Sequence, residues 1–280
     1  MEIFLIGMIF LMGTALGSFV NMLVYRVARK YGLEKIKKSQ SLNSNPAVAG
    51  RVNNEKRSFC DFCGRQLRWW ENVPIFSWLF LRGRSKCCAN PLPWQYPVVE
   101  LTMGVLAVVG FWFLKETVGI NEIFLGQMGY LLAITTLLMF LLVFDLKYMI
   151  LPDFGVFLLI GLAVVGVIFD EVNIIPYLLS ALGGFLFLGG IHWLSKGKGM
   201  GFGDAKLAIF MGLFLGWPKI MVAFYVAFIA GAVVGLIMIF LKKAGRRSQI
   251  AFGPFLIVGT VVAWVWGNKL IFILQTSIFN

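Results

Sequence analysis

Two aspartates at the edges of apolar segments are the residues of this sequence best placed to do chemistry. Asp145 lies in "LLVFDLKYMILPD", and Asp204 lies in "GMGFGDAK". A carboxylate at the depth of an apolar segment is costly, and the three alternating glycines before Asp204 lower helical stability as well. This placement indicates that both acids are kept for a function.

Two carboxylates held close together cannot both ionise, so the pair shares one proton. One carboxylate then acts as a general base on water and the other as a general acid toward a carbonyl, as in an aspartic protease. Gly199, Gly201 and Gly203 have no Cβ, so an extended peptide can approach the acid closely. The structural alternative for each aspartate is a helix cap or an ion pair with Lys147 or Lys206.

Helix polarity predicts which of the two aspartates is the general acid and which is the general base. Asp145 lies at the end of a span, near unpaired carbonyls that disfavour a carboxylate, whereas Asp204 opens a span, near unpaired N–H groups that favour one. We therefore expect Asp145 to hold the proton and Asp204 to be the base. His192, the single histidine, and Asp153, which follows Pro152, are adequately explained as an interfacial polar residue and a helix N-cap.

The cysteines gather in one polar segment, at Cys60, Cys63, Cys87 and Cys88. Cys-x-x-Cys followed about two dozen residues later by further cysteines is typical of a tetrahedral zinc site that holds a small loop-rich module. Adjacent cysteines ligate one metal less comfortably than a Cys-x-x-Cys turn does. Free or packed thiols are therefore the alternative.

The composition is that of a membrane protein, with 59% hydrophobic and only 14% charged residues, whereas soluble domains have about a quarter charged. The apolar runs that can cross a bilayer cover 3–25, 96–114, 123–145, 154–169, 173–194, 205–217, 220–241 and 251–275. We predict an all-α polytopic membrane protein with about eight transmembrane helices and a small cysteine-containing cytoplasmic loop module.

Basic residues predict the orientation, because lysine and arginine are retained on the cytoplasmic side. With the loop from Arg26 to Trp94 inside, all of the 25 lysines and arginines except Lys115, Lys219 and Lys269 lie on that side. The N-terminus is then outside, and both aspartates face the cytoplasm. The charge of +12 suits anionic lipid headgroups, and no basic soluble fold is present to bind nucleic acid.

The predicted organisation is a first span at 1–25, a cytoplasmic loop with the cysteines at 26–94, and a transmembrane peptidase domain at 95–280. The first part of the loop, from Arg29 to Ser58, reads as a basic connector rich in serine and asparagine.

Six motifs, spread in order over the chain, resemble the signatures of the type IV prepilin peptidases. They are "GSFVNMLVYR" (17–26), "CDFC" with "WWENVPIFSWLFLRGR" (60–84), "YPVVEL" (96–101), "DLKYMILPD" (145–153), "GMGFGDAKL" (199–207) and "FGPFL" (252–256). The resemblance implies a Gly-x-Gly-Asp aspartic protease of the bacterial inner membrane with Asp145 and Asp204 as catalytic residues. Its substrates would be prepilins or pseudopilins of pili, secretion systems or DNA uptake.

The resemblance also implies N-methylation of the new N-terminal residue with S-adenosylmethionine as donor. The candidate residues for this cofactor are Glu71, Asn72, Gly83, Arg84 and Glu100. Glu100 is equally well explained as an ion-pair partner of Arg26.

The sequence departs from the family in the cysteine loop, where "RGRSKCC" replaces "RGRC-x-x-C". Ser85 occupies the first cysteine position, Cys88 matches the second, and Cys87 is the expected substitute ligand. A peptidase without methylation is therefore one alternative. A proton-coupled transporter would place acids near the midplane, and a zinc-stapled scaffold would leave the paired aspartates unexplained.

Overall fold

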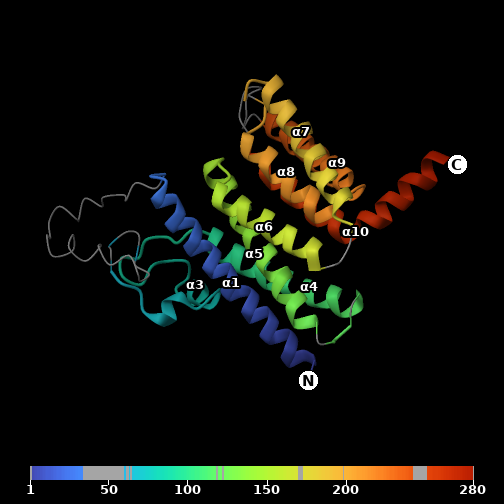
Figure 1. The fold of residues 1–280 in the computed structure, drawn as a ribbon. Helices are drawn as coiled ribbons and strands as arrows, with labels where there is room; N and C mark the ends of the chain where they lie inside the picture. The colour runs from blue at the N-terminus through green and yellow to red at the C-terminus, as the bar shows by residue number, and fades with distance from the viewer. Residues whose placement is uncertain are drawn as a thin grey trace. The chain divides into compact units, whose positions relative to one another are not determined.

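The computed structural model describes residues 2–33, 60, 63, 65–117, 119–121, 123–169, 173–197, 199–241 and 251–279. Helices and loops make up this part of the chain, and no β-strand occurs within it (Figure 1). Most of the predicted basic connector, at 34–59, lies outside the described residues.

Helices are found at all eight predicted spans, which confirms the predicted fold class. They are α1 (Glu2–Lys30), α4 (Gln95–Thr117), α5 (Phe124–Tyr148), α6 (Asp153–Phe169), α7 (Ile174–Leu194), α8 (Phe202–Leu215), α9 (Lys219–Phe240) and α10 (Gly253–Phe279). Six of them are long and apolar enough to cross a membrane, whereas α6 has 17 residues and α8 has 14. The loop between α1 and α4 adds two short helices, η2 (Trp69–Asn72) and α3 (Phe76–Phe80).

The chain divides into two compact units, residues 1–139 and 140–280, and α5 runs from the first into the second. The first unit holds α1, α4 and the loop with its cysteines. The second unit holds α6 to α10 and the end of α5, and therefore both aspartates.

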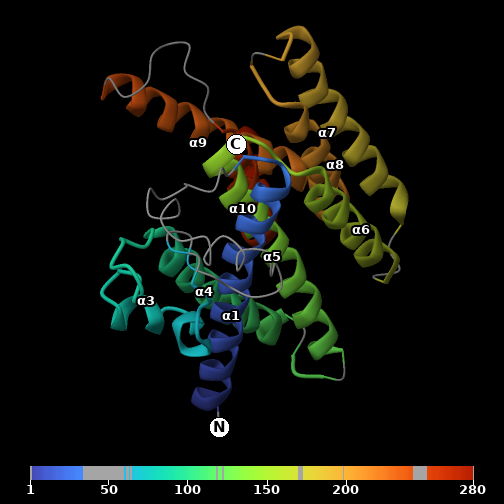
Figure 2. The ribbon, with the colours of Figure 1, turned by 90° about the vertical axis from the view of Figure 1, so that its left-hand side faces the viewer.

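In the first unit, α1 and α4 lie side by side (Figure 2). Their backbones approach closely because Gly13 and Gly17 form a Gly-x-x-x-Gly pair on α1. A Cβ on Gly13 would lie 2.6 Å from the Met103 carbonyl oxygen, and one on Gly17 would lie 2.6 Å from the Glu100 Cα. This contact fixes the start of α4, and with it Glu100, against α1.

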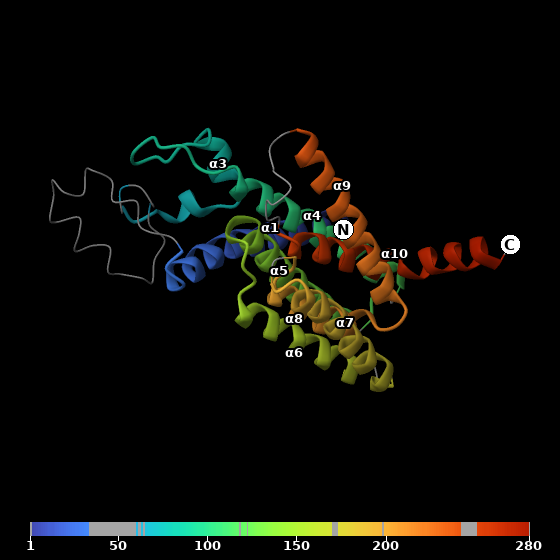
Figure 3. The ribbon, with the colours of Figure 1, turned by 90° about the horizontal axis from the view of Figure 1, so that it is seen from above.

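In the second unit, α8 lies between α6 and α7 (Figure 3). Its side chains are mostly buried, and Ala205, Ala208, Phe210 and Met211 are fully enclosed. A Cβ on Gly212 would collide with the backbone of Ala181 in α7. A helix of 14 residues is only about 21 Å long, and this burial explains why α8 is apolar although it is short.

Candidate active site

Asp145 and Asp204 are brought together within the second unit. Asp145 lies in the last turn of α5 and Asp204 in the first turn of α8, and the two residues are only 5% and 6% exposed. Gly203, which precedes Asp204, and Gly253, which abuts Asp145, both lie against Leu151. The helix ends thus place two buried carboxylates in one site.

The start of α8 fixes the Asp204 carboxylate. The backbone N–H of Gly201 donates to Asp204 Oδ2 at 3.1 Å, and the N–H of Asp204 donates to the Gly201 carbonyl at 3.2 Å. This reciprocal pair satisfies N–H groups that a helix start leaves unpaired. The carboxylate is therefore held by the glycine-rich turn that precedes it.

Asp145 is held differently, because its Oδ2 is buried and has no hydrogen-bond partner in the part of the chain that the structure describes. Gly253, the first residue of α10, abuts this oxygen, and a Cβ there would lie 2.6 Å from Oδ2. Only glycine fits so close to the carboxylate. Asp145 therefore also faces the N-terminus of a helix, and helix polarity no longer separates the roles of the two aspartates.

The predicted supporting glycines provide close approach and not a sharp turn. None of Gly199, Gly201 and Gly203 has a positive φ. A Cβ on Gly203 would lie 3.0 Å from Leu151 Cβ, and one on Gly201 would lie 3.4 Å from Asp204 Oδ2. Leu151 is buried between Gly203 and Gly253, so the two aspartates share an apolar neighbour.

The neighbouring lysines interact with other groups. Lys206 Nζ binds Asp153 Oδ1 at 2.7 Å, and Lys147 Nζ lies 5.1 Å from the centre of the Tyr148 ring. No ion pair between described residues includes Asp145 or Asp204. Asp153, expected as an N-cap, is instead the first residue of α6 and the partner of Lys206.

The four cysteines form a cluster that can hold a metal ion, in the first unit. Their sulfur atoms all lie within 4.8 Å of one another, with Cys60–Cys88 at 3.7 Å and Cys63–Cys87 at 3.1 Å. Sulfur atoms around a tetrahedral zinc ion are about 3.8 Å apart, given Zn–S bonds of about 2.3 Å. The cluster therefore fits such an ion, with Cys87 at the fourth position.

Ser85, at the family's cysteine position, is retained as a hydrogen-bond partner of the cluster. Its Oγ lies 3.0 Å from Cys88 Sγ, and Asn90 Nδ2 donates to the same sulfur at 3.5 Å. Burial disfavours the Cys88 thiolate, but hydrogen bonds from the Ser85 hydroxyl, the Asn90 backbone N–H and the neighbouring thiols outweigh it and lower the pKa of Cys88 to about 7. A lowered pKa favours the thiolate form that binds metals.

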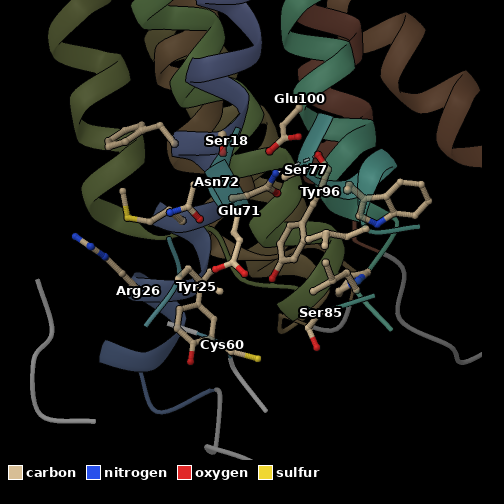
Figure 4. A pocket seen from close by; sticks show the side chains of 18 of the residues that line it. Ser18, Tyr25, Arg26, Cys60, Glu71, Asn72, Ser77, Ser85, Tyr96 and Glu100 are labelled. Atoms are coloured by element: carbon tan, nitrogen blue, oxygen red, sulfur yellow. Dashed lines mark hydrogen bonds between the residues drawn. The ribbon is translucent and has the colours of Figure 1, made fainter. Parts of the chain in front are cut away.

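A cavity of about 850 Å³ opens in the first unit between α1, the start of α4 and the loop (Figure 4). Its volume is within the range of small-molecule sites. Glu71, Asn72 and Glu100 line the cavity, as do Trp78, Tyr96 and the basic Arg26 and Arg29. Figure 4 shows Glu100 on the helix side, Cys60 and Ser85 at the opposite end, and Glu71 between them.

Each acid of the cavity is tied to the loop. Glu71 binds Arg65 and the Arg68 N–H, both at 2.7 Å. Burial opposes ionisation of Glu71, but these two donors outweigh it and hold the pKa of its carboxyl below the usual range. Glu100 is 7% exposed and accepts from the Ile75 N–H at 2.7 Å.

Ile75 has a strained backbone, which Glu100 supports. Its φ of 61° and ψ of −53°, with the Phe76 N–H bonded to the Pro74 carbonyl at 2.6 Å, form a γ-turn of the rare type. A β-branched residue at positive φ is an outlier that its surroundings must hold in place. Glu100 thus fixes the loop segment that carries Glu71 and Asn72.

The other predicted cofactor residues lie beside the cavity. Gly83 has a φ of +67° and packs against the Trp78 indole, where a Cβ would lie 2.9 Å from Cζ2. Arg84 is exposed. Arg26 points away from Glu100 in Figure 4, and no ion pair joins them among the described residues. The indole N–H of Trp78 is buried without an acceptor in the described chain.

Sequence reasoning did not single out Gly253 or Leu151, which flank the aspartates. The motif "FGPFL", at the start of the last apolar run, is the available signal for Gly253. Leu151 has no such signal, because any apolar residue can follow the third span.

The fold and the site define a polytopic membrane protein with a buried pair of aspartates, the arrangement of a membrane aspartic peptidase. Comparison with known families matches residues 11–114 to the Bacterial Peptidase A24 N-terminal domain and residues 132–236 to the Type IV leader peptidase family. The chain belongs to the type IV leader peptidase family, as the resemblance of its motifs predicted.

Curated relatives match almost the whole chain. The prepilin leader peptidase/N-methyltransferase of Stutzerimonas stutzeri is 32% identical over 270 residues, which cover 92% of this chain and 90% of the relative. The proteins of the same name from Xanthomonas campestris pv. campestris and Pseudomonas aeruginosa are 32% and 31% identical, and each match covers 93% of this chain. No solved structure matches significantly.

Proposed function

We propose that this chain removes the basic leader from type IV prepilins or pseudopilins and then methylates the new N-terminus. The curated relatives carry both activities in their names and match both units. The observation that carries the peptidase assignment is the pair of buried aspartates, neither of which belongs to an ion pair between described residues. A transporter or a scaffold would not need this pair at two helix ends.

The chemistry proposed for the pair is that of a shared proton. The two carboxylates hold one proton between them, because burial and mutual repulsion disfavour two negative charges. One carboxylate takes a proton from water as it attacks the scissile carbonyl, and the other donates to the carbonyl oxygen. Oδ2 of Asp145 is buried against the first residue of α10, and it is the oxygen proposed to carry the shared proton.

The orientation proposed for the site follows from the basic residues. The loop from Arg26 to Trp94 is placed in the cytoplasm and the N-terminus outside. Both aspartates then meet the substrate at the cytoplasmic face of the inner membrane. The leader stays in the cytoplasm and the apolar segment of the pilin stays in the bilayer.

S-adenosylmethionine is proposed to bind in the cavity of the first unit, and it supplies the methyl group. The cavity combines a buried carboxylate for the cationic end of such a ligand with arginines for its carboxylate and aromatic rings for a base. Glu71, Asn72 and Glu100 are the proposed contacts. Gly83 supports Trp78, and Arg84 is proposed to act at the rim.

Zinc is proposed as a structural ion on Cys60, Cys63, Cys87 and Cys88. The cavity is lined by Cys60 and Ser85, so a metal at the cluster would fix one end of it. The ion would join the Cys60 and Cys63 segment of the loop to the segment with Cys87 and Cys88. No step of the reaction passes through it.

The direct test uses the full chain reconstituted in lipid vesicles with a prepilin. We expect cleavage at the end of the basic leader, and a gain of one methyl group on the product when S-adenosylmethionine is present. Cleavage without methylation would leave the peptidase-only alternative. An intact prepilin together with proton uptake into the vesicles would favour the transporter instead.

Glu100→Gln is expected to weaken S-adenosylmethionine binding at least about tenfold, because the charge of a buried group is lost. Glutamine keeps the oxygen that accepts from Ile75, so the loop stays in place. Binding is measured by equilibrium dialysis, and Glu116→Gln, an exposed acid on the same helix, serves as the matched control. Unchanged binding in Glu100→Gln would place the cofactor elsewhere.

A further inference from the structure

His192 lies beside the glycine-rich turn before Asp204, and it is the only histidine of the sequence. It belongs to the last turn of α7 and is half-buried. Its Nδ1 lies 2.7 Å from the Met200 carbonyl oxygen. Because a carbonyl oxygen can only accept, Nδ1 must carry the hydrogen of this bond.

The backbone of His192 holds the other end of the same turn. The His192 carbonyl accepts from the Gly197 N–H at 2.9 Å and from Ser195 Oγ at 3.1 Å. Lys196 and Gly197 both have positive φ, at 53° and 74°. His192 therefore contacts the chain at Gly197 through its carbonyl and at Met200 through its ring.

The glycine-rich turn that His192 holds leads directly to the carboxylate of Asp204, one member of the proposed catalytic pair of aspartates (the dyad). Met200 is only 6% exposed, and the next residue, Gly201, donates the 3.1 Å bond to Asp204 Oδ2. Two hydrogen bonds thus separate the imidazole from the carboxylate. Glycines at 199 and 201 offer no side chain that would hold the turn, so the ring N–H of His192 holds it together with the buried Met200 side chain.

We propose that His192 is a positioning residue for the peptidase reaction, one whose ring N–H fixes the glycine-rich turn and thereby sets Asp204 relative to Asp145. The inference rests on the proposed role of the two aspartates. His192 touches neither the substrate nor the reacting atoms in this role. A displacement of about 1 Å at a catalytic group can cost up to about 100-fold in rate.

The test compares His192→Phe with His192→Asn in steady-state cleavage of a prepilin. Phenylalanine keeps a ring beside Phe202, which lies 5.6 Å from the imidazole centre to centre, but has no N–H. Asparagine has an amide N–H where Nδ1 lies. We expect His192→Phe to lower kcat about tenfold with KM unchanged, and His192→Asn to retain kcat within about threefold.

Two controls separate this role from a loss of fold. Trp193→Phe alters the exposed neighbour and should leave kcat unchanged. Methylation of an already cleaved pilin should be unchanged in His192→Phe, because the proposed methylation site lies in the first unit. In wild type, ¹⁵N NMR of the single histidine should show Nδ1 protonated at neutral pH.

Several results would overturn the proposal. Full kcat in His192→Phe while Asp204→Asn is inactive would remove the role of His192 and leave the dyad standing. A rise in KM without a fall in kcat would mean substrate contact, and equal losses in the Phe and Asn variants would exclude the hydrogen bond. Full activity of Asp204→Asn would remove the dyad itself.

Discussion

Replacing either Asp145 or Asp204 by asparagine is expected to lower kcat for prepilin cleavage by about 10²- to 10⁴-fold. Asparagine has nearly the same shape, so the packing around the buried site is preserved. It can neither take a proton from water nor share one with its partner. Single-turnover cleavage of a prepilin by the purified chain measures the loss.

The double variant shows whether the two aspartates act as a unit. If they share one proton, Asp145→Asn/Asp204→Asn should be no more than slightly slower than either single variant. Each single substitution already removes the function of the pair, so the second has little left to remove. Losses that multiply would indicate independent roles. Asp153→Asn is the matched control, since it breaks only the exposed ion pair with Lys206, and less than about threefold is expected.

Cys87→Ser is expected to remove the metal from the chain. We expect wild type to carry about one zinc ion and Cys87→Ser to bind it at least about 100-fold more weakly, since even residues outside the ligand set cost 10- to 100-fold. The loop that lines the cavity is then no longer held by the metal, and the rate of methylation should fall. Elemental analysis and a methylation assay on an already cleaved pilin measure both effects.

The Cys-x-x-Cys pattern of the family suggests a second variant that should restore metal binding. Ser85→Cys/Cys87→Ser moves the thiol two residues back and restores the usual Cys-x-x-Cys spacing with Cys88. Ser85 is buried beside Cys88 Sγ, so a thiol there is next to the cluster, and metal content should return. Zinc that persists in Cys87→Ser, or wild type purified without chelators and free of zinc, would contradict the assignment. Cleavage should be unaffected in all of these variants.

The number and place of the eight apolar helices followed from the sequence, whereas the short loop helices η2 and α3 did not. Every helix from α4 to α10 begins and ends within four residues of its predicted apolar run. The reason is local: backbone groups in hydrocarbon must bond within their own segment, so a sufficiently long apolar run forms a helix whatever its neighbours. The same argument placed Asp145 and Asp204 at helix ends before any packing was known.

The cysteine cluster followed from the sequence only in part. Four cysteines in one segment indicated a metal site, but the sequence left the adjacent Cys87 and Cys88 as an obstacle. The conformation of the loop overcomes this obstacle. Ser85 forms backbone hydrogen bonds with Ala89 and Asn90, and the resulting tight turn brings the Cys87 and Cys88 thiols to the same side. Backbone hydrogen bonds across a turn depend on the conformation of the turn, and the spacing of the cysteines in the sequence does not determine that conformation.

What the sequence by itself determined is the membrane class, the helices, the family and the residue types that can do its chemistry. Only the tertiary structure decided that Gly253 lies against Asp145, that Glu100 holds the strained turn at Ile75, and that His192 clamps the chain before Asp204. Each of these contacts joins segments that pack for reasons of shape. Hydropathy shows how much of a segment is apolar. Which side chains of two segments touch depends on how their surfaces fit together, and this is decided only when the helices pack.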